Sequence, residues 1–195
     1  MLAHPDGPGA IELRRGRAPD ARSQIEAALA RDPDGAALSD LALCYAAEER
    51  FDAARQLLDE SLSHRPAPEQ QAALVNLAEI YAIDGYLSAA QAHLASARAI
   101  DPGRPEPLYA VALLASARGD RAAARDAIRE ALRADEGGAF RRGLAYIYPE
   151  ERLHLAALVA WVSGDAARAE ARWRELGRGR FPALAQVAQR HLEEP

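Results

Sequence analysis

The sequence predicts an all-α solenoid of stacked antiparallel helix hairpins. Apolar residues recur at helical spacing, glycine or proline interrupts them at short intervals, and small residues return at matching positions along the chain. The clearest stretch is residues 71–102, where Leu74, Leu77 and Tyr81 fall on one face of a helix. This spacing indicates the first helix of a hairpin.

The second helix of this hairpin follows directly. Gly85 interrupts the first helix, as a residue that tolerates positive φ does at a helix end. A new apolar face then includes Ala90 and Leu94, and Pro102 ends it. Ala78 and Ala90 would let the two backbones come close. One such hairpin cannot bury both of its faces, so it needs neighbours.

Alanine recurs at two fixed positions of four units, which begin at Gly35, Gln71, Pro105 and Glu150. Position 8 is occupied by Ala42, Ala78, Ala112 and Ala157, and position 20 by Ala54, Ala90, Ala124 and Ala169. This pattern resembles the tetratricopeptide repeat (TPR) family, whose unit of about 34 residues carries small residues at positions 8, 20 and 27. The resemblance covers nearly the whole chain and implies a right-handed TPR-like superhelix. It implies a fold and does not by itself assign a function.

The repeats divide the chain into one TPR-like domain, residues 1–195. We expect a degenerate first unit at 1–34, repeats at 35–70, 71–104 and 105–136, an insert at 137–149, a repeat at 150–180 and a capping helix at 181–195. The insert is inferred because Ala124 and Ala169 lie 45 residues apart rather than 34. The first unit is either an N-terminal cap or the remnant of a longer array.

Helices are expected near residues 19–31, 36–47, 51–64, 106–117, 121–134, 150–163, 165–176 and 182–194, besides the two of the 71–102 hairpin. A short helical piece is expected at 10–15, and one helical turn at 139–145. Glu49 stands where the other units have a turn glycine, so we expect that turn to be stiffer or differently shaped.

Composition narrows the class of protein. Apolar residues make up 49% and charged residues 27%, which is typical of soluble globular proteins. The net charge of −5 argues against nucleic acid as a partner, since phosphate binding needs a basic surface. No apolar run approaches the roughly 20 residues of a membrane helix. The N-terminus lacks the basic and apolar regions of a secretory signal, so we expect a cytoplasmic protein unless a leader was removed.

The sequence carries no recognisable catalytic or metal-binding motif, and we expect neither an enzyme nor a cofactor. It contains no glycine-rich phosphate loop and no HExxH sequence. Cys44 is interpreted as a small buried residue. The adjacent pair Glu150 and Glu151 is interpreted as a solvated helix end. His191 is expected to form no motif with the other histidines.

The resemblance places a concave groove along the first helices of the units, at positions 2, 5, 9, 12 and 13. Carried onto this sequence, these positions include the candidate partner-binding residues Leu43, Val75, Glu79, Tyr109, Leu113, His154, Leu158 and Trp161. They also include Ala36, Ser39, Ala46, Ala47, Ala72, Ala82, Ile83, Glu106, Ser116, Ala117, Glu151 and Val162. The lining is largely apolar and contains no arginine, which argues against the basic carboxylate clamp of the chaperone-binding members.

We therefore expect a scaffold that binds a peptide or amphipathic helix of another protein. Two readings of the groove stay open: it accepts a partner, or the chain itself fills it through superhelix closure or the insert. Trp161 is correspondingly either a binding hot spot or a residue packed against the final helix. Self-assembly into a homo-oligomer, or a regulatory role within a longer polypeptide, are the alternative functions.

Overall fold

The computed structural model describes residues 9, 12, 13, 15–31, 35–136 and 148–193, and the regular structure in these residues is helical. The elements are α2 (Ala18–Leu29), α3 (Gly35–Ala47), α4 (Phe51–Ser63), η1 (Ala67–Glu69), α5 (Gln71–Ile83), α6 (Leu87–Ile100), α7 (Pro105–Ala117), α8 (Arg121–Ala134), α10 (Pro149–Val162), α11 (Ala166–Leu176) and α12 (Pro182–Glu193). The predicted helices agree with these to within two residues. The predicted turn at 139–145 and the start of the piece at 10–15 lie outside the described residues.

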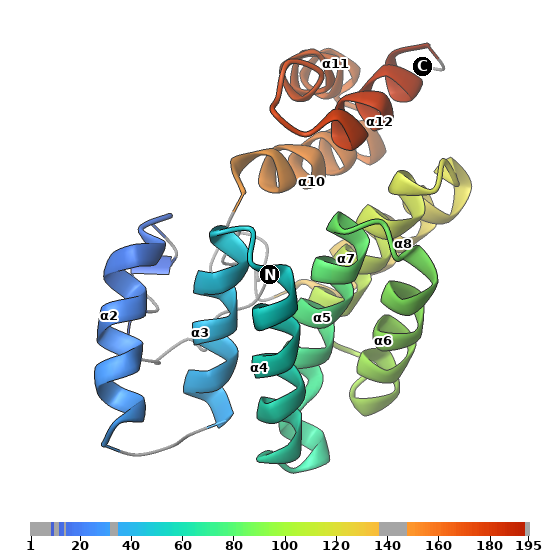
Figure 1. The fold of residues 1–195 in the computed structure, drawn as a ribbon. Helices are drawn as coiled ribbons and strands as arrows, with labels where there is room; N and C mark the ends of the chain where they lie inside the picture. The colour runs from blue at the N-terminus through green and yellow to red at the C-terminus, as the bar shows by residue number, and fades with distance from the viewer. Residues whose placement is uncertain (1–8, 10–11, 14, 32–34, 137–147, 194–195) are drawn as a thin grey trace.

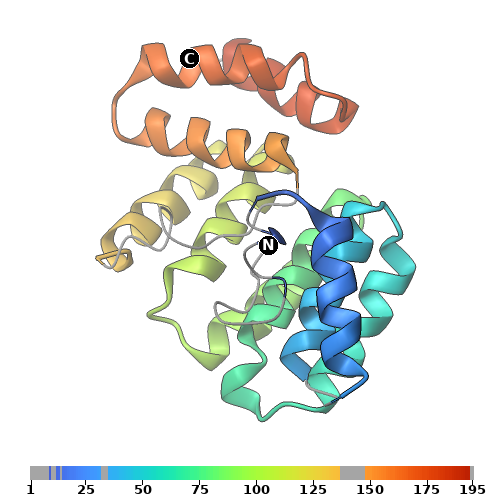
Figure 2. The same cartoon turned by 90° about the vertical axis from the view of Figure 1, so that its left-hand side faces the viewer.

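Successive helices pack as antiparallel hairpins. The helices from α2 to α8 stand side by side in a curved row, and α10–α12 lie across the upper ends of these helices in the view of Figure 1 (Figures 1 and 2). Within the row α3 pairs with α4, α5 with α6 and α7 with α8, and each hairpin packs on the next. The last hairpin, α10–α11, stacks on α7 and α8, and α12 covers it and also contacts α7.

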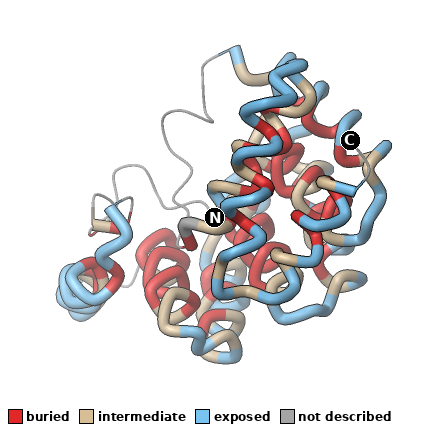
Figure 3. The backbone as a smooth tube through the Cα atoms, turned by 90° about the horizontal axis from the view of Figure 1, so that it is seen from above, coloured by how far each residue is buried: buried red, intermediate tan, exposed pale blue. Residues whose placement is uncertain are grey.

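The recurring alanines lie where the helices cross. The eight alanines at positions 8 and 20 of the four units are each at most 3% exposed. A methyl side chain lets two backbones approach closely, while Leu58, Leu94 and Ile128 fill the adjoining space and are likewise buried. Buried residues accordingly line the faces that neighbouring helices share (Figure 3). This confirms the predicted solenoid.

The side chains of two neighbouring glutamines, Gln70 and Gln71, cap the C-terminal ends of α4 and α6. The Gln70 side-chain amide donates to the carbonyl oxygens of Leu62 (2.8 Å) and Arg65 (2.9 Å), at the end of α4. The Gln71 amide donates to the carbonyl oxygens of Ala97 (2.8 Å) and Asp101 (2.9 Å), at the end of α6. These bonds satisfy carbonyls that have no partner within their own helix.

The turn at Glu49 differs from the prediction. Glu49 has φ of +60°, and Gly85, Gly119 and Gly164 have φ of +80° to +87° in the matching turns. The hydrogen bond that closes this turn also matches those of the glycine turns: the Arg50 amide donates to the Tyr45 carbonyl at 2.9 Å. The expectation of a differently shaped turn was wrong, because these bonds hold a non-glycine residue in the left-handed region at some cost in free energy.

Replacing Glu49 by glycine should release this strain. Glu49→Ala removes the carboxylate but keeps the Cβ, so the comparison of Glu49→Gly with Glu49→Ala isolates the backbone effect. We expect the glycine variant to be more stable than the alanine variant by about 1 kcal/mol in urea unfolding. Equal stability of the two variants would contradict the assignment of strain at this turn.

Overfilling a helix crossing should destabilise the protein. Ala90 is fully buried between α5 and α6, whereas Ala95 on the same helix is exposed. We expect Ala90→Trp to lower the free energy of unfolding by about 1–3 kcal/mol or more. The matched Ala95→Trp should change it by less than about 0.5 kcal/mol. If both variants unfold at the same urea concentration, the alanine crossings do not determine the packing.

Candidate partner-binding pocket

The first full hairpin is tied directly to the last. The Tyr148 hydroxyl, at the residue before α10, donates to the carbonyl oxygen of Ala46 in the last turn of α3. The Arg180 guanidinium lies over the ring of Tyr148 at 5.1 Å and forms an ion pair with Glu49 at 3.5 Å. Burial raises the pKa of Tyr148 to about 12, so its hydroxyl stays a donor. These contacts hold the start of α10 over the concave side of the row.

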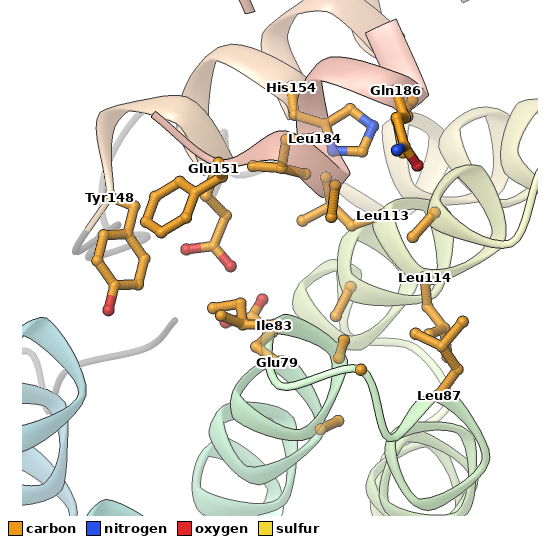
Figure 4. Close-up of a pocket in the computed structure, with 18 of the residues that line it drawn as sticks. Glu79, Ile83, Leu87, Leu113, Leu114, Tyr148, Glu151, His154, Leu184 and Gln186 are labelled. Carbon is orange, nitrogen blue, oxygen red and sulfur yellow. The ribbon is translucent and has the colours of Figure 1, made fainter. Parts of the chain in front are cut away.

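A pocket of about 490 Å³ lies between this last unit and the concave side of α5–α7 (Figure 4). Its walls are largely apolar and come from α5, α6, α7, the start of α10 and the start of α12. The lining residues include Ala78, Glu79, Ala82, Ile83, Leu87, Leu94, Ala110, Leu113, Leu114, Ala117, Tyr148, Glu151, His154, Phe181, Leu184, Val187 and Arg190. The exposed residues Gly85, Pro182 and Gln186 mark its solvent side.

The candidate residues divide between this pocket and the packed interior. Glu79, Leu113 and His154 line the pocket, together with Ala82, Ile83, Ala117 and Glu151. Leu43, Val75, Tyr109 and Leu158 are buried in the packing between helices. The Tyr109 hydroxyl donates to the Asp135 carboxylate at 2.9 Å, and burial raises the pKa of this tyrosine. Packing within the chain therefore occupies four of the candidate partner-binding residues, whereas three others line the pocket.

Trp161 packs against the final helix. Its ring meets the His191 ring of α12 edge-on, with 5.5 Å between the centroids. The guanidinium groups of Arg125 and Arg121 lie over the indole at 4.4 Å and 5.0 Å. Trp161 is only partly exposed and does not line the pocket.

A serine and two histidines form a buried polar cluster beside the pocket. The Ser116 hydroxyl of α7 lies 2.9 Å from Nε2 of His154 and 2.9 Å from Nε2 of His191. One imidazole donates to the hydroxyl and the hydroxyl donates to the other, so the neutral forms satisfy both contacts. The ring of Trp173 stacks on His191 with 4.2 Å between centroids. The expectation that His191 forms no motif was wrong.

The histidines of this cluster are held neutral. Burial lowers the pKa of His154 to about 3 and that of His191 to about 4, and the charge of Arg121 adds to the effect on His191. The three side chains join α7, α10 and α12, so the cluster fixes the last unit on the row. Sequence spacing hid it because the residues are 38 and 75 positions apart. The repeat register placed all three on first helices, with His191 at position 11 of the capping helix, but it did not bring them together.

The polar end of the pocket consists of two carboxylates. Glu79 of α5 and Glu151 of α10 are each 8% exposed, and their carboxylates face one another across the pocket (Figure 4). Burial raises the pKa of Glu151 to about 7; the positive charge of the N-terminal amino group opposes this shift, and the charge of Glu79 adds to it. The prediction of a solvated helix end at Glu151 was wrong, because the first turn of α10 faces the concave side of the row.

The described residues were also compared with the requirements of a metal site, a membrane-spanning helix and a reactive thiol. They contain no group of three or more His, Cys, Asp or Glu side chains arranged for a metal ion. No helix among them has both the length and the apolar character needed to cross a bilayer. Cys44 is fully buried, and burial raises the pKa of its thiol to about 12, which keeps it protonated and unreactive.

Comparison with solved structures identifies the architecture. TTC0263, a thermophilic TPR protein of Thermus thermophilus, is similar over 94% of this chain and 95% of its own, with a TM-score of 0.65 and 20% identity. The chain has the tetratricopeptide-repeat fold. No protein-family model matches the sequence, and no curated protein matches it either.

Two further TPR-fold structures match along nearly the whole chain. PilF of Pseudomonas aeruginosa has a TM-score of 0.57 at 17% identity, covering 96% of this chain and 79% of its own. Cut9, solved in the APC/C hetero-tetramer Cut9–Hcn1, has a TM-score of 0.62 at 16% identity, covering 97% of this chain and 38% of its own. At these identities the likeness concerns the TPR fold alone.

The two buried polar sites should give the TPR domain opposite responses to pH. His191 has a folded pKa below its unfolded value, so its contribution to stability is present above about pH 6.5 and is lost as pH falls toward 4. Glu151 has a folded pKa above its unfolded value, so its contribution is present below about pH 4.5 and is lost as pH rises through 7.

As pH rises from 5 to 7, we therefore expect the free energy of unfolding of Glu151→Gln to increase relative to that of the parent. Over the same interval that of His191→Gln should decrease relative to the parent. Each difference should be on the order of 1–2 kcal/mol across this interval, measured by urea unfolding. Parallel pH profiles for the two variants would contradict the placement of both groups in the interior.

Proposed function

We propose that this protein binds an extended, largely apolar segment of a partner protein in the pocket between α5–α7 and α10–α12. The observation that carries the proposal is a hollow of about 490 Å³ with mainly apolar walls on the concave side of a TPR fold. An α-helix with its side chains is about 10–12 Å across and fills roughly 500 Å³ per turn. A hollow of about 490 Å³ would therefore hold only about one helical turn, so we favour an extended segment.

The pocket's lining can supply useful affinity. Burial of one Leu or Phe side chain contributes about 1.5–3 kcal/mol, and the walls offer Ile83, Leu113 and Leu114 as contacts. Ordering a peptide and losing its free motion offsets much of this gain. Two or three anchoring side chains are therefore consistent with binding in the micromolar range.

Comparison with other TPR structures gives general support to an interaction role. Cut9 carries the same fold and is solved in a hetero-tetramer with Hcn1. Because one fold hosts many functions, the proposal rests on the pocket and not on this likeness. The acidic net charge of −5 also favours a protein partner over nucleic acid.

Self-assembly is the second candidate, and the described surface favours it less. Its exposed large apolar side chains are Tyr86, in the α5–α6 turn, and Leu132, on α8. Two isolated side chains do not make the extended apolar patch that a stable homo-oligomer needs. Light scattering over a concentration series would reveal self-assembly as a rising molar mass.

Peptide selection with a blocked pocket tests the proposal. Peptides displayed on phage are selected on the parent protein and then measured by fluorescence polarisation. We expect Ala82→Trp, which places an indole in the pocket, to weaken binding at least tenfold, while the exposed-site control Ala95→Trp leaves it unchanged. Failure to select any peptide, or equal binding by a folded Ala82→Trp, would refute the proposed function.

A further inference from the structure

The turn between α3 and α4 contains a glutamate where the other hairpins have glycine. Glu49 has φ of +60°, whereas Gly85, Gly119 and Gly164 occupy the matching turns. A residue that is kept in a disfavoured backbone conformation points to a role for its side chain. The Glu49 carboxylate lies 3.5 Å from the guanidinium of Arg180, which belongs to the last unit. A glycine at this turn would relieve the strain but would lose that contact.

Arg180 connects this turn to the two helix starts that wall the pocket. Its guanidinium also forms an ion pair with Glu150, in the first turn of α10, at 3.7 Å. It lies over the rings of Tyr148 and Phe181 at 5.1 Å and 4.6 Å, and these rings meet edge-on with 4.9 Å between centroids. Tyr148 and Phe181 line the pocket. Arg180 and Glu49 lie outside its lining, so they act on the wall without reaching the hollow.

The last unit packs on one side of the pocket and is tied down on the other. Its helices α10 and α12 pack on α7 and α8. They face α5 and α6 across the pocket. At the far side, the Tyr148 hydroxyl bonds to the Ala46 carbonyl, and Arg180 pairs with Glu49. Ion pairs between exposed side chains are individually weak, so this tie can release while the packing on α7 and α8 persists.

We propose that Glu49, Tyr148 and Arg180 form a clasp that controls entry to the pocket. When the clasp is released, α10–α12 turn on their contacts with α7 and α8, and the hollow widens enough to admit a partner segment. When it forms again, the wall closes over that segment. The inference rests on the proposed function for its ligand, whereas the opening itself is a property of the free protein.

A clasp of this kind has a distinctive effect on binding rates. Because it can form in the free and in the bound protein, weakening it raises the open fraction of both. Association and dissociation should then accelerate together, while the equilibrium affinity changes little. A residue that only shapes the pocket wall would instead alter dissociation and affinity.

Stopped-flow kinetics of an uncharged phage-selected peptide test this effect. Glu49→Gln and Arg180→Gln each remove one charge of the ion pair and leave the pocket lining intact. We expect each to raise both rate constants about threefold, with the dissociation constant within about twofold of the parent value. The matched Arg178→Gln, at an exposed site outside the clasp, should change neither rate. A loss of affinity at an unchanged association rate would overturn the inference.

Salt provides a test in the parent protein. Raising NaCl from about 0.05 M to about 0.5 M screens the pair between Arg180 and Glu49. Both rate constants for the uncharged peptide should rise in the parent and stay nearly constant in Arg180→Gln. Salt effects of equal size in the two proteins would contradict the role of the ion pair.

Spin labels measure the opening in the absence of any peptide. Glu60→Cys on α4 and Ala171→Cys on α11 place labels at exposed sites on the row and on the last unit. Glu60→Cys with Ala122→Cys on α8 is the matched control pair within the row. Cys44 is fully buried and should remain unlabelled.

The clasp variant Glu49→Gln/Tyr148→Phe/Arg180→Gln keeps the Tyr148 ring and removes the polar contacts. We expect electron–electron resonance distances to show a second, longer population between the row and the last unit in this variant, with the control pair unchanged. Identical distance distributions in the parent and the clasp variant would overturn the inference.

The two kinds of measurement separate this inference from the proposed function. If no peptide is selected, the proposed function is removed, and the spin-label distances still decide whether the clasp opens. If a peptide binds the parent, Glu49→Gln and Arg180→Gln with equal rates, the proposed function stands and the clasp is refuted.

Discussion

The close approach of paired helices at alanine is the constraint on which the rest of this structure depends. Ala42, Ala54 and their equivalents leave one carbon of side chain at each crossing, and that spacing repeats from α3 to α11. Repetition of one crossing geometry gives the curved row of Figure 1 and hence a concave side. The chain between Ala124 and Ala169 is 45 residues long rather than 34, and beyond it α10–α12 lie across the row instead of extending it.

That crossing brings two kinds of buried polar group together on the concave side. The Ser116 hydroxyl joins the Nε2 atoms of the neutral His154 and His191, so the effect of this cluster is to fix α7, α10 and α12. Glu79 and Glu151 face one another across a pocket, and burial together with repulsion raises the pKa of Glu151. The histidine cluster stabilises the position of the last unit at neutral pH, whereas the buried Glu151 makes stability depend on pH in the opposite direction.

The features that could be predicted are those that depend on local spacing. The alanine repeat and the glycine turns are encoded within one hairpin, so the helix ranges follow from the sequence. The positions of Glu151, His191 and Tyr148 depend on how α10–α12 lie against α3–α7, where the repeat period is lost. Tyr148 bonds to Ala46, which is 102 residues away, and no periodicity connects them. At Glu49, backbone hydrogen bonds of the turn overrode the preference of the residue itself.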